Sequence, residues 1–176
     1  MRSLLAAALV ASLPSAAVTL QGPADIASLA ASADAVLRAQ VVKIESAWAG
    51  GDPKSGLIVT FVDLRPIEVW KGDRAETVRV QVPGGAVGDL GQISQGAATF
   101  EAGEEVVVFL QRRAPGTFQV ERWALGKFKV RPNAGGEPRA LRSRDGITCR
   151  ECRPGEADEL PLAELKAKVL AVREAK

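Results

Sequence analysis

Apolar residues recur at every second position through the middle of this chain, and this alternation constrains the fold more than any other feature. Residues 77–82, 117–121 and 127–131 each alternate between polar and apolar side chains. A period of two places successive side chains on opposite faces of a strand. The region 35–131 is therefore predicted to be mainly β-sheet, with most of its strands buried on one face.

Two longer segments depart from the simple alternation and predict bent strands. In 36–48, apolar side chains occupy odd positions up to Val41 and even positions from Val42 onward. A strand that changes its buried face in this way needs a bulge. The segment 57–70 has a mixed pattern, and its Pro66 cannot donate to a ladder. Long bent strands shared between layers close small sheets into barrels.

These patterns predict a mainly β fold, a small closed or partly open Greek-key barrel of the OB type. A β-sandwich is the competing architecture. Residues 106–110 are apolar on both faces and should form a central strand that is covered on each side.

The two ends of the chain have helical periodicity. A short helix is expected after Pro23, with Asp25 near its start, and a second over 161–176 with an apolar stripe for docking. The region 132–160 is rich in Gly, Pro and Arg, has no period, and is expected to be a loop that belongs to the same domain.

The first residues are typical of a secretory signal peptide. Arg2 precedes an apolar run over 4–13, Pro14 breaks it, and small residues follow up to Ala17. A membrane-spanning helix needs roughly 20 apolar residues, about twice this run. We therefore expect cleavage after residue 17, a single domain over 18–176, and an exported protein in the periplasm or outside the cell.

The absence of histidine is the main constraint on chemistry. The chain has no His and no Tyr, and its formal net charge is +2. Ser-His-Asp hydrolysis, His-ligated zinc and imidazole acid–base chemistry are excluded. A nearly neutral domain also lacks the charge that drives nucleic-acid binding. We expect a protein that is not an enzyme and has no cofactor or metal, no nucleic-acid partner and no membrane span.

Cys149 and Cys152 form a Cys-x-x-Cys pair in the Arg/Gly/Pro-rich region. In an exported protein the expected state is a disulfide that closes a small loop. A thioredoxin-like redox pair and one half of a shared metal site are alternatives, although two thiolates cannot complete the four ligands of zinc.

Two sets of residues are candidates for a binding surface. Lys127, Lys129 and Arg131 share one face of a predicted strand and could contact an anionic surface, although a solvated sheet face has the same pattern. Tryptophans stand close to the ends of predicted strands, where they fill a core or form a contact surface at a barrel mouth. They are Trp48, Trp70 and Trp123.

Two further segments are expected to be turns. The glycine-rich segment 83–91 has neither the order nor the Lys-Ser/Thr of a phosphate-binding loop, and its glycines suit positive φ. Glu101, Glu104 and Glu105 flank Gly103, where solvated turn charges are expected.

The middle of the chain resembles short exported bacterial proteins with a netrin-like or TIMP-like OB barrel. The resemblance is carried by residues 35–42, 69–72, 82–85, 100–104 and 126–128. It implies a binding barrel, because some such barrels inhibit secreted metalloproteases through an N-terminal cysteine that chelates the zinc. The expected mature N-terminus here is a valine, so the resemblance does not extend to that mechanism.

The leading hypothesis from sequence is an exported, non-catalytic β-barrel that binds another exported protein, with a secreted protease as one candidate partner. One alternative is a structural component of the cell envelope or surface that uses the basic face. Another is a periplasmic thiol–disulfide protein that uses the cysteine pair. The oligomeric state stays open.

Overall fold

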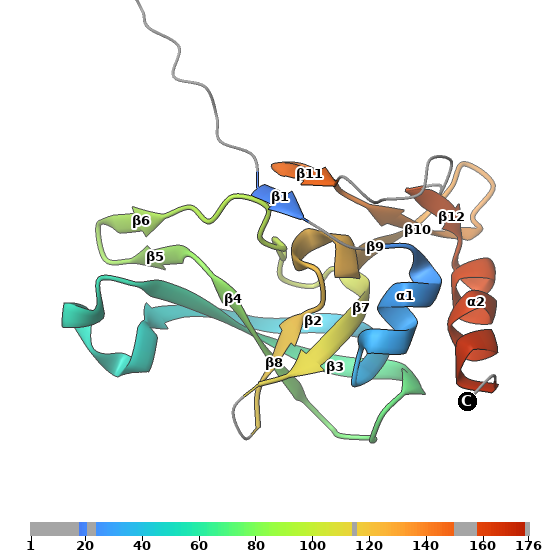
Figure 1. Ribbon diagram of the computed structural model, residues 1–176, viewed down its shortest axis with the longest axis horizontal. Coiled ribbons are helices and arrows are strands. Elements are labelled where there is room, and N and C mark those ends of the chain that lie inside the picture. The colour runs from blue at the N-terminus through green and yellow to red at the C-terminus, as the bar shows by residue number, and fades with distance from the viewer. Residues whose placement is uncertain (1–17, 21–23, 114–115, 150–157, 175–176) are drawn as a thin grey trace, which may run out of the picture.

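Strands are the main secondary structure of the described residues, as the alternation predicts. The computed structural model describes residues 18–20, 24–113, 116–149 and 158–174 (Figure 1). The predicted signal peptide over 1–17 lies outside these residues. The elements, in order, are β1 (Val18–Leu20), α1 (Ile26–Ser32), β2 (Ala35–Trp48), the 3-10 turns η1 (Ala49–Gly51) and η2 (Pro53–Ser55), β3 (Ile58–Lys71), β4 (Val78–Pro83), β5 (Gly85–Val87), β6 (Leu90–Gln92), β7 (Glu105–Arg112), β8 (Phe118–Val120), the 3-10 turn η3 (Trp123–Gly126), β9 (Lys127–Pro132), β10 (Pro138–Arg142), β11 (Ile147–Cys149), β12 (Glu159–Pro161) and α2 (Leu162–Glu174).

Eight of the described strands form one large sheet, in the order β12-β10-β9-β7-β2-β3-β4-β8. The strand β8 also pairs with β7, so that β7, β2, β3, β4 and β8 form a ring of five strands. One edge of β7 is shared between two neighbours. Its residues 110–112 pair with β8, which closes the ring, and its residues 106–108 pair with β9, which leads the sheet away from it.

The predicted bulge in β2 is confirmed by its register with β3. Val41 pairs with Leu64 and Lys43 with Asp63, so that Val42 has no partner in the ladder. Beyond this extra residue Ile44 and Ser46 pair with Val62 and Thr60, so the even positions share the face of the ring interior, although Val42 and Ile44 remain 45% and 37% exposed. Pro66 lies within β3, and the ladder shifts register beside it, between Arg38 and Ala39.

The strand β7 is buried on both faces, as expected for residues 106–110. Val106, Val108 and Leu110 belong to the core inside the ring. Val107 and Phe109 belong to a second core on the opposite face of the sheet, where α1 and α2 pack. Both cores therefore depend on this one strand.

Both predicted helices are present and lie side by side on the outer face of the sheet (Figure 1). Asp25 caps α1, because its carboxylate accepts a hydrogen bond from the Ser28 N–H at 2.9 Å. The C-terminal helix starts one residue later than expected, at Leu162, because Pro161 pairs with Arg139 as the last residue of β12.

The prediction of a loop over 132–160 is partly wrong. The strand β10 pairs with β9 on one side and β12 on the other, and β11 pairs in parallel with β1. These short strands have little alternation of their own. Neighbouring strands supply their register, and that information is not local in the sequence.

Glu68 connects α2 to the ring. Its carboxylate accepts hydrogen bonds from Lys166 of α2 at 2.5 Å, from Arg38 of β2 at 2.8 Å and from the indole N–H of Trp70 at 3.1 Å. The bond from Lys166, followed by those from Arg38 and Trp70, lowers the pKa of Glu68 from its ordinary value of 4.5 to about 2.

This pKa predicts a loss of stability in acid. A carboxylate whose folded pKa is lowered stabilises the fold above the ordinary value of 4.5, and that stabilisation is lost as the pH falls toward 2. Urea unfolding at several pH values should therefore show a steeper acid loss for the natural chain than for Glu68→Gln. The exposed Glu76, replaced by Gln, is the control and should keep the natural profile. Equal acid slopes for Glu68→Gln and the natural chain would contradict the role of Glu68.

The dependence of both cores on β7 predicts a large effect of truncation. Phe109 is fully buried and packs against Phe128 with ring centroids 5.9 Å apart. Phe109→Ala should lower the free energy of unfolding by about 3–5 kcal/mol, measured by urea denaturation. Ile93, which is 89% exposed, is the control, and Ile93→Ala should change stability by no more than about 0.5 kcal/mol.

Candidate functional site

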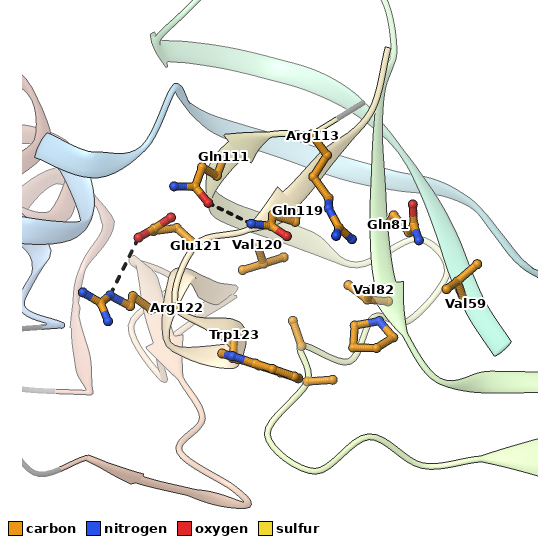
Figure 2. A pocket seen from close by; sticks show the side chains of 13 residues that line it. Val59, Gln81, Val82, Gln111, Arg113, Gln119, Val120, Glu121, Arg122 and Trp123 are labelled. Carbon is orange, nitrogen blue, oxygen red and sulfur yellow. Dashed lines mark hydrogen bonds and ion pairs between the residues drawn. The ribbon is translucent and has the colours of Figure 1, made fainter. Parts of the chain in front are cut away.

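The ring is joined most weakly between β4 and β8, and a cleft opens there. These two strands run parallel and share a single ladder pair, Val80 with Phe118. Beyond that pair lies a cavity of about 620 Å³, lined by residues of β4, β7, β8 and η3 (Figure 2). Its volume is within the range of ligand-binding pockets, ~300–1,000 Å³.

The direction of the main chain in β4 explains one side of the cleft. The N–H of Gly84 donates to the carbonyl of Ile58 in β3 at 2.9 Å. Because main-chain polar groups alternate in direction along an antiparallel pair, those of Gln81 and Pro83 point away from β3, toward β8. Proline has no N–H, and its place on this edge therefore leaves only a carbonyl facing the cleft.

The other side of the cleft follows from β8. The N–H of Glu121 donates to the carbonyl of Phe109 in β7 at 2.8 Å, so the main-chain groups of Val120 point away from β7, toward β4. A continued parallel ladder would need a donor at position 83 for the Val120 carbonyl. Pro83 has none, and the ladder therefore ends where the cleft begins.

Amide side chains surround the mouth of the cleft. Gln81, Gln119 and Gln111 lie on the neighbouring strands β4, β8 and β7, and Gln119 donates to Gln111 at 2.8 Å. Each amide can donate and accept hydrogen bonds. Beside them, Arg113 extends over the opening (Figure 2) and forms no ion pair with any residue in the described part of the chain. The floor between these groups is apolar, formed in part by Val82 and Val120.

Trp123 lies on the other side of the cleft from Gln119 and Arg113 (Figure 2). It follows Arg122, and both residues have positive φ, 52° at Arg122 and 59° at Trp123. For residues without special turn chemistry this conformation costs about 1–3 kcal/mol, and such strain concentrates at functional sites. The surrounding turn must therefore stabilise it.

The turn is held by a close approach of its two ends. A Cβ added at Gly126 would overlap the carbonyl oxygen of Glu121. Ala124 also donates to the carbonyl of Gly96 at 3.0 Å, and Leu125 is fully buried beneath the turn. The indole of Trp123 is therefore positioned by a tightly packed backbone.

The three tryptophans do not form one surface. Trp123 lines the cleft, whereas Trp48 ends β2 beside its partner Ile58 and is only partly exposed. Trp70 is 2% exposed and belongs to the core beneath the helices.

The basic residues of β9 lie outside the cleft, and two of them are paired. Lys127 contacts Glu104 at 2.6 Å, and Lys129 contacts Glu101 and also Glu104, the latter at 3.4 Å. Burial, opposed by the bond to Glu104, lowers the pKa of Lys127. Arg131 is exposed at the end of the row. The positive charge of this strand is thus largely neutralised within the protein.

The expectation of solvated glutamates in the turn is wrong for Glu104. Its side chain is 4% exposed, and its Oε1 accepts bonds from Lys127 and from the N–H of Glu101. Burial of a carboxylate requires such partners. The lysines come from β9, which pairs with β7 only in the folded sheet, so the local sequence carries no sign of them.

The cysteine pair is not placed by the structure. The strand β11 ends at Cys149, and the side chain of Cys149 and the whole of Cys152 lie outside the described residues. In the described part of the chain, no helix is long and apolar enough to cross a bilayer, and no cluster of acidic or sulfur ligands could hold a metal ion.

The chain matches no known protein family, and no curated protein matches it in sequence. Sequence reasoning found Trp123 but missed Arg113 and the three glutamines, because a glutamine on a strand is typical of any solvated face. Only the register places Gln111 opposite Gln119.

The close approach at Gly126 predicts a specific effect. Gly126→Ala should lower the free energy of unfolding by about 1–3 kcal/mol, because the new methyl group overlaps the Glu121 carbonyl. It should also change the fluorescence of Trp123, which the turn positions. A methyl group added at Gly91 would meet nothing within 4 Å, so Gly91→Ala is the control, with stability unchanged within about 0.5 kcal/mol.

Proposed function

We propose that this protein is an exported, non-catalytic binding module that recognises another exported protein through the cleft between β4 and β8. The observation that carries the proposal is the composition of the cleft. Amides, a guanidinium group with no ion pair among the described residues and an indole surround an apolar floor. Interfaces bind through such a combination of aromatic anchors, arginine and polar groups around an apolar centre.

We also propose a fold type for the five-stranded ring. The strands of the ring follow the order β2-β3-β4-β8-β7, and β7 pairs in turn with β2. The first three strands form a meander, and β8 and β7 close the ring between β4 and β2. This order supports a partly open Greek-key barrel of the OB type. OB barrels present open faces and loops to extended ligands.

The chemistry of the cleft favours binding over catalysis. Among the residues that line it, the titratable groups are Arg113, Arg122 and Glu121. The carboxylate of Glu121 lies 3.8 Å from Arg122 and accepts a hydrogen bond from Ser32 at 3.1 Å. A carboxylate that is held by two partners is suited to fixing the turn. Glutamine amides neither add to a carbonyl as nucleophiles nor act as general acids or bases near neutral pH.

The signal-peptide pattern supports export, and it is the reason to expect an exported partner. A secreted protease remains one candidate. The basic strand has less support as a binding surface, because Lys127 and Lys129 already contact glutamates.

Site-specific crosslinking tests this function. A photoreactive amino acid in place of Gln119 should form an adduct with a protein of the envelope or secreted fraction. Unmodified protein in excess should abolish that adduct by competition. The same amino acid in place of Lys168, on the exposed side of α2, is the control and should form none. Equal adducts from both positions, or none from Gln119, would contradict the proposal.

A further inference from the structure

We propose that the cleft holds an extended, carboxylate-bearing segment of a partner polypeptide, whose main chain pairs with the edge of β4. This inference rests on the proposed function and adds the chemical form of the ligand. It is drawn from three features of the cleft: the strand edges that border it, the side chains at its mouth and its floor.

The main chain along both edges of the cleft has the direction of groups in a β-ladder. The carbonyls of Gln81 and Pro83 in β4 and the main-chain groups of Val120 in β8 are directed toward the gap, whereas the N–H of Gln81 belongs to the ladder pair of Val80 with Phe118. Pro83 contributes a carbonyl that β8 cannot use in a reciprocal pair. An extended peptide supplies N–H donors at the repeat of a strand, and strand addition to an exposed edge is a common form of peptide recognition.

The side chains at the mouth indicate charge as well as extension. Arg113 has no ion pair in the described part of the chain, and it extends over the opening beside Gln81 and Gln119 (Figure 2). A guanidinium group binds a carboxylate through charge-assisted hydrogen bonds, often through two at once. The segment should therefore carry an Asp, a Glu or a free C-terminus at this position.

The floor suits the alternate side chains of an extended segment. Val82 and Val120 form part of it, and Trp123 borders it on the other side. In a strand, every second side chain points to the same face. An apolar residue on either side of the acidic one would then face the valines, while the carboxylate stays at the mouth with Arg113.

A saccharide is the main competing ligand, because an indole and amides also suit sugars. The strand edges favour a peptide over a saccharide. The main-chain groups along the parallel strands β4 and β8 form a linear array, and an extended peptide can pair with such an array. Pro83 further supports this choice. Without an N–H it cannot donate to Val120, so the ladder between β4 and β8 ends where an added strand would pair.

A selection of displayed random peptides of about twelve residues on the immobilised full domain tests the inference. Enriched peptides should contain an acidic residue flanked by apolar ones. Methylation of alternate peptide nitrogens should weaken binding by roughly tenfold or more, because each removes a main-chain donor. Methylation of the intervening nitrogens should have little effect.

Two variants connect the peptide to the cleft. Arg113→Glu should weaken binding of the selected peptide by roughly 10–100-fold, through loss of a charged hydrogen bond. Pro83→Ala supplies the missing donor to Val120, and we expect slower hydrogen exchange of the amide at position 83 together with weaker peptide binding. Pro53→Ala, in the exposed turn η2, is the matched control and should bind as the natural protein does. Circular dichroism verifies that each variant is folded.

The outcomes separate this inference from the proposed function. A protein adduct from Gln119, combined with no enriched peptide or with indifference to N-methylation, overturns strand addition and leaves the binding function standing. Loss of the adduct as well overturns both. Binding to a glycan array that Arg113→Glu abolishes, without peptide binding, overturns both in favour of a saccharide.

Discussion

Burial of β7 on both faces is the constraint on which the rest of the structure depends. Its even-numbered valines face the interior of the ring, while Val107 and Phe109 face the helices. A strand with two buried faces must be covered by two layers, so the sheet has to curve around one face and carry α1 and α2 on the other. The same strand pairs with β2, β8 and β9, which ties the closure of the ring to the extension of the sheet.

The cleft lies where the closure of the ring is weakest, between β4 and β8. Along one edge, β7 pairs with both β8 and β9, and β8 is only three residues long. It meets β4 at a single ladder pair. Pro83 prevents a second pair, and the turn around Gly126 packs against the other side of the opening. Local chemistry at Pro83 and Gly126 thus shapes two sides of the cavity.

The distribution of charge agrees with the proposed binding site in the cleft. The buried Glu104 neutralises lysines that would otherwise form a basic surface, and Glu68 is held by cations and an indole at the base of the helices. These carboxylates stabilise the junctions between layers. Arg113 differs from them, because it extends over the cleft without an ion pair in the described part of the chain. In the proposed binding mode, this cation beside a concave apolar surface binds the anionic group of the partner.

The sequence by itself determined the elements whose signal is local. Alternation identified the main strands, the change of face in β2 located its bulge, and spacing and capping identified both helices, because these periods follow from backbone geometry. The short strands within 132–160, the burial of Glu104 and the grouping of the three glutamines were decided only by tertiary structure. Each of them depends on which strand lies beside which, and pairing between residues far apart in the chain leaves no periodic trace in either segment.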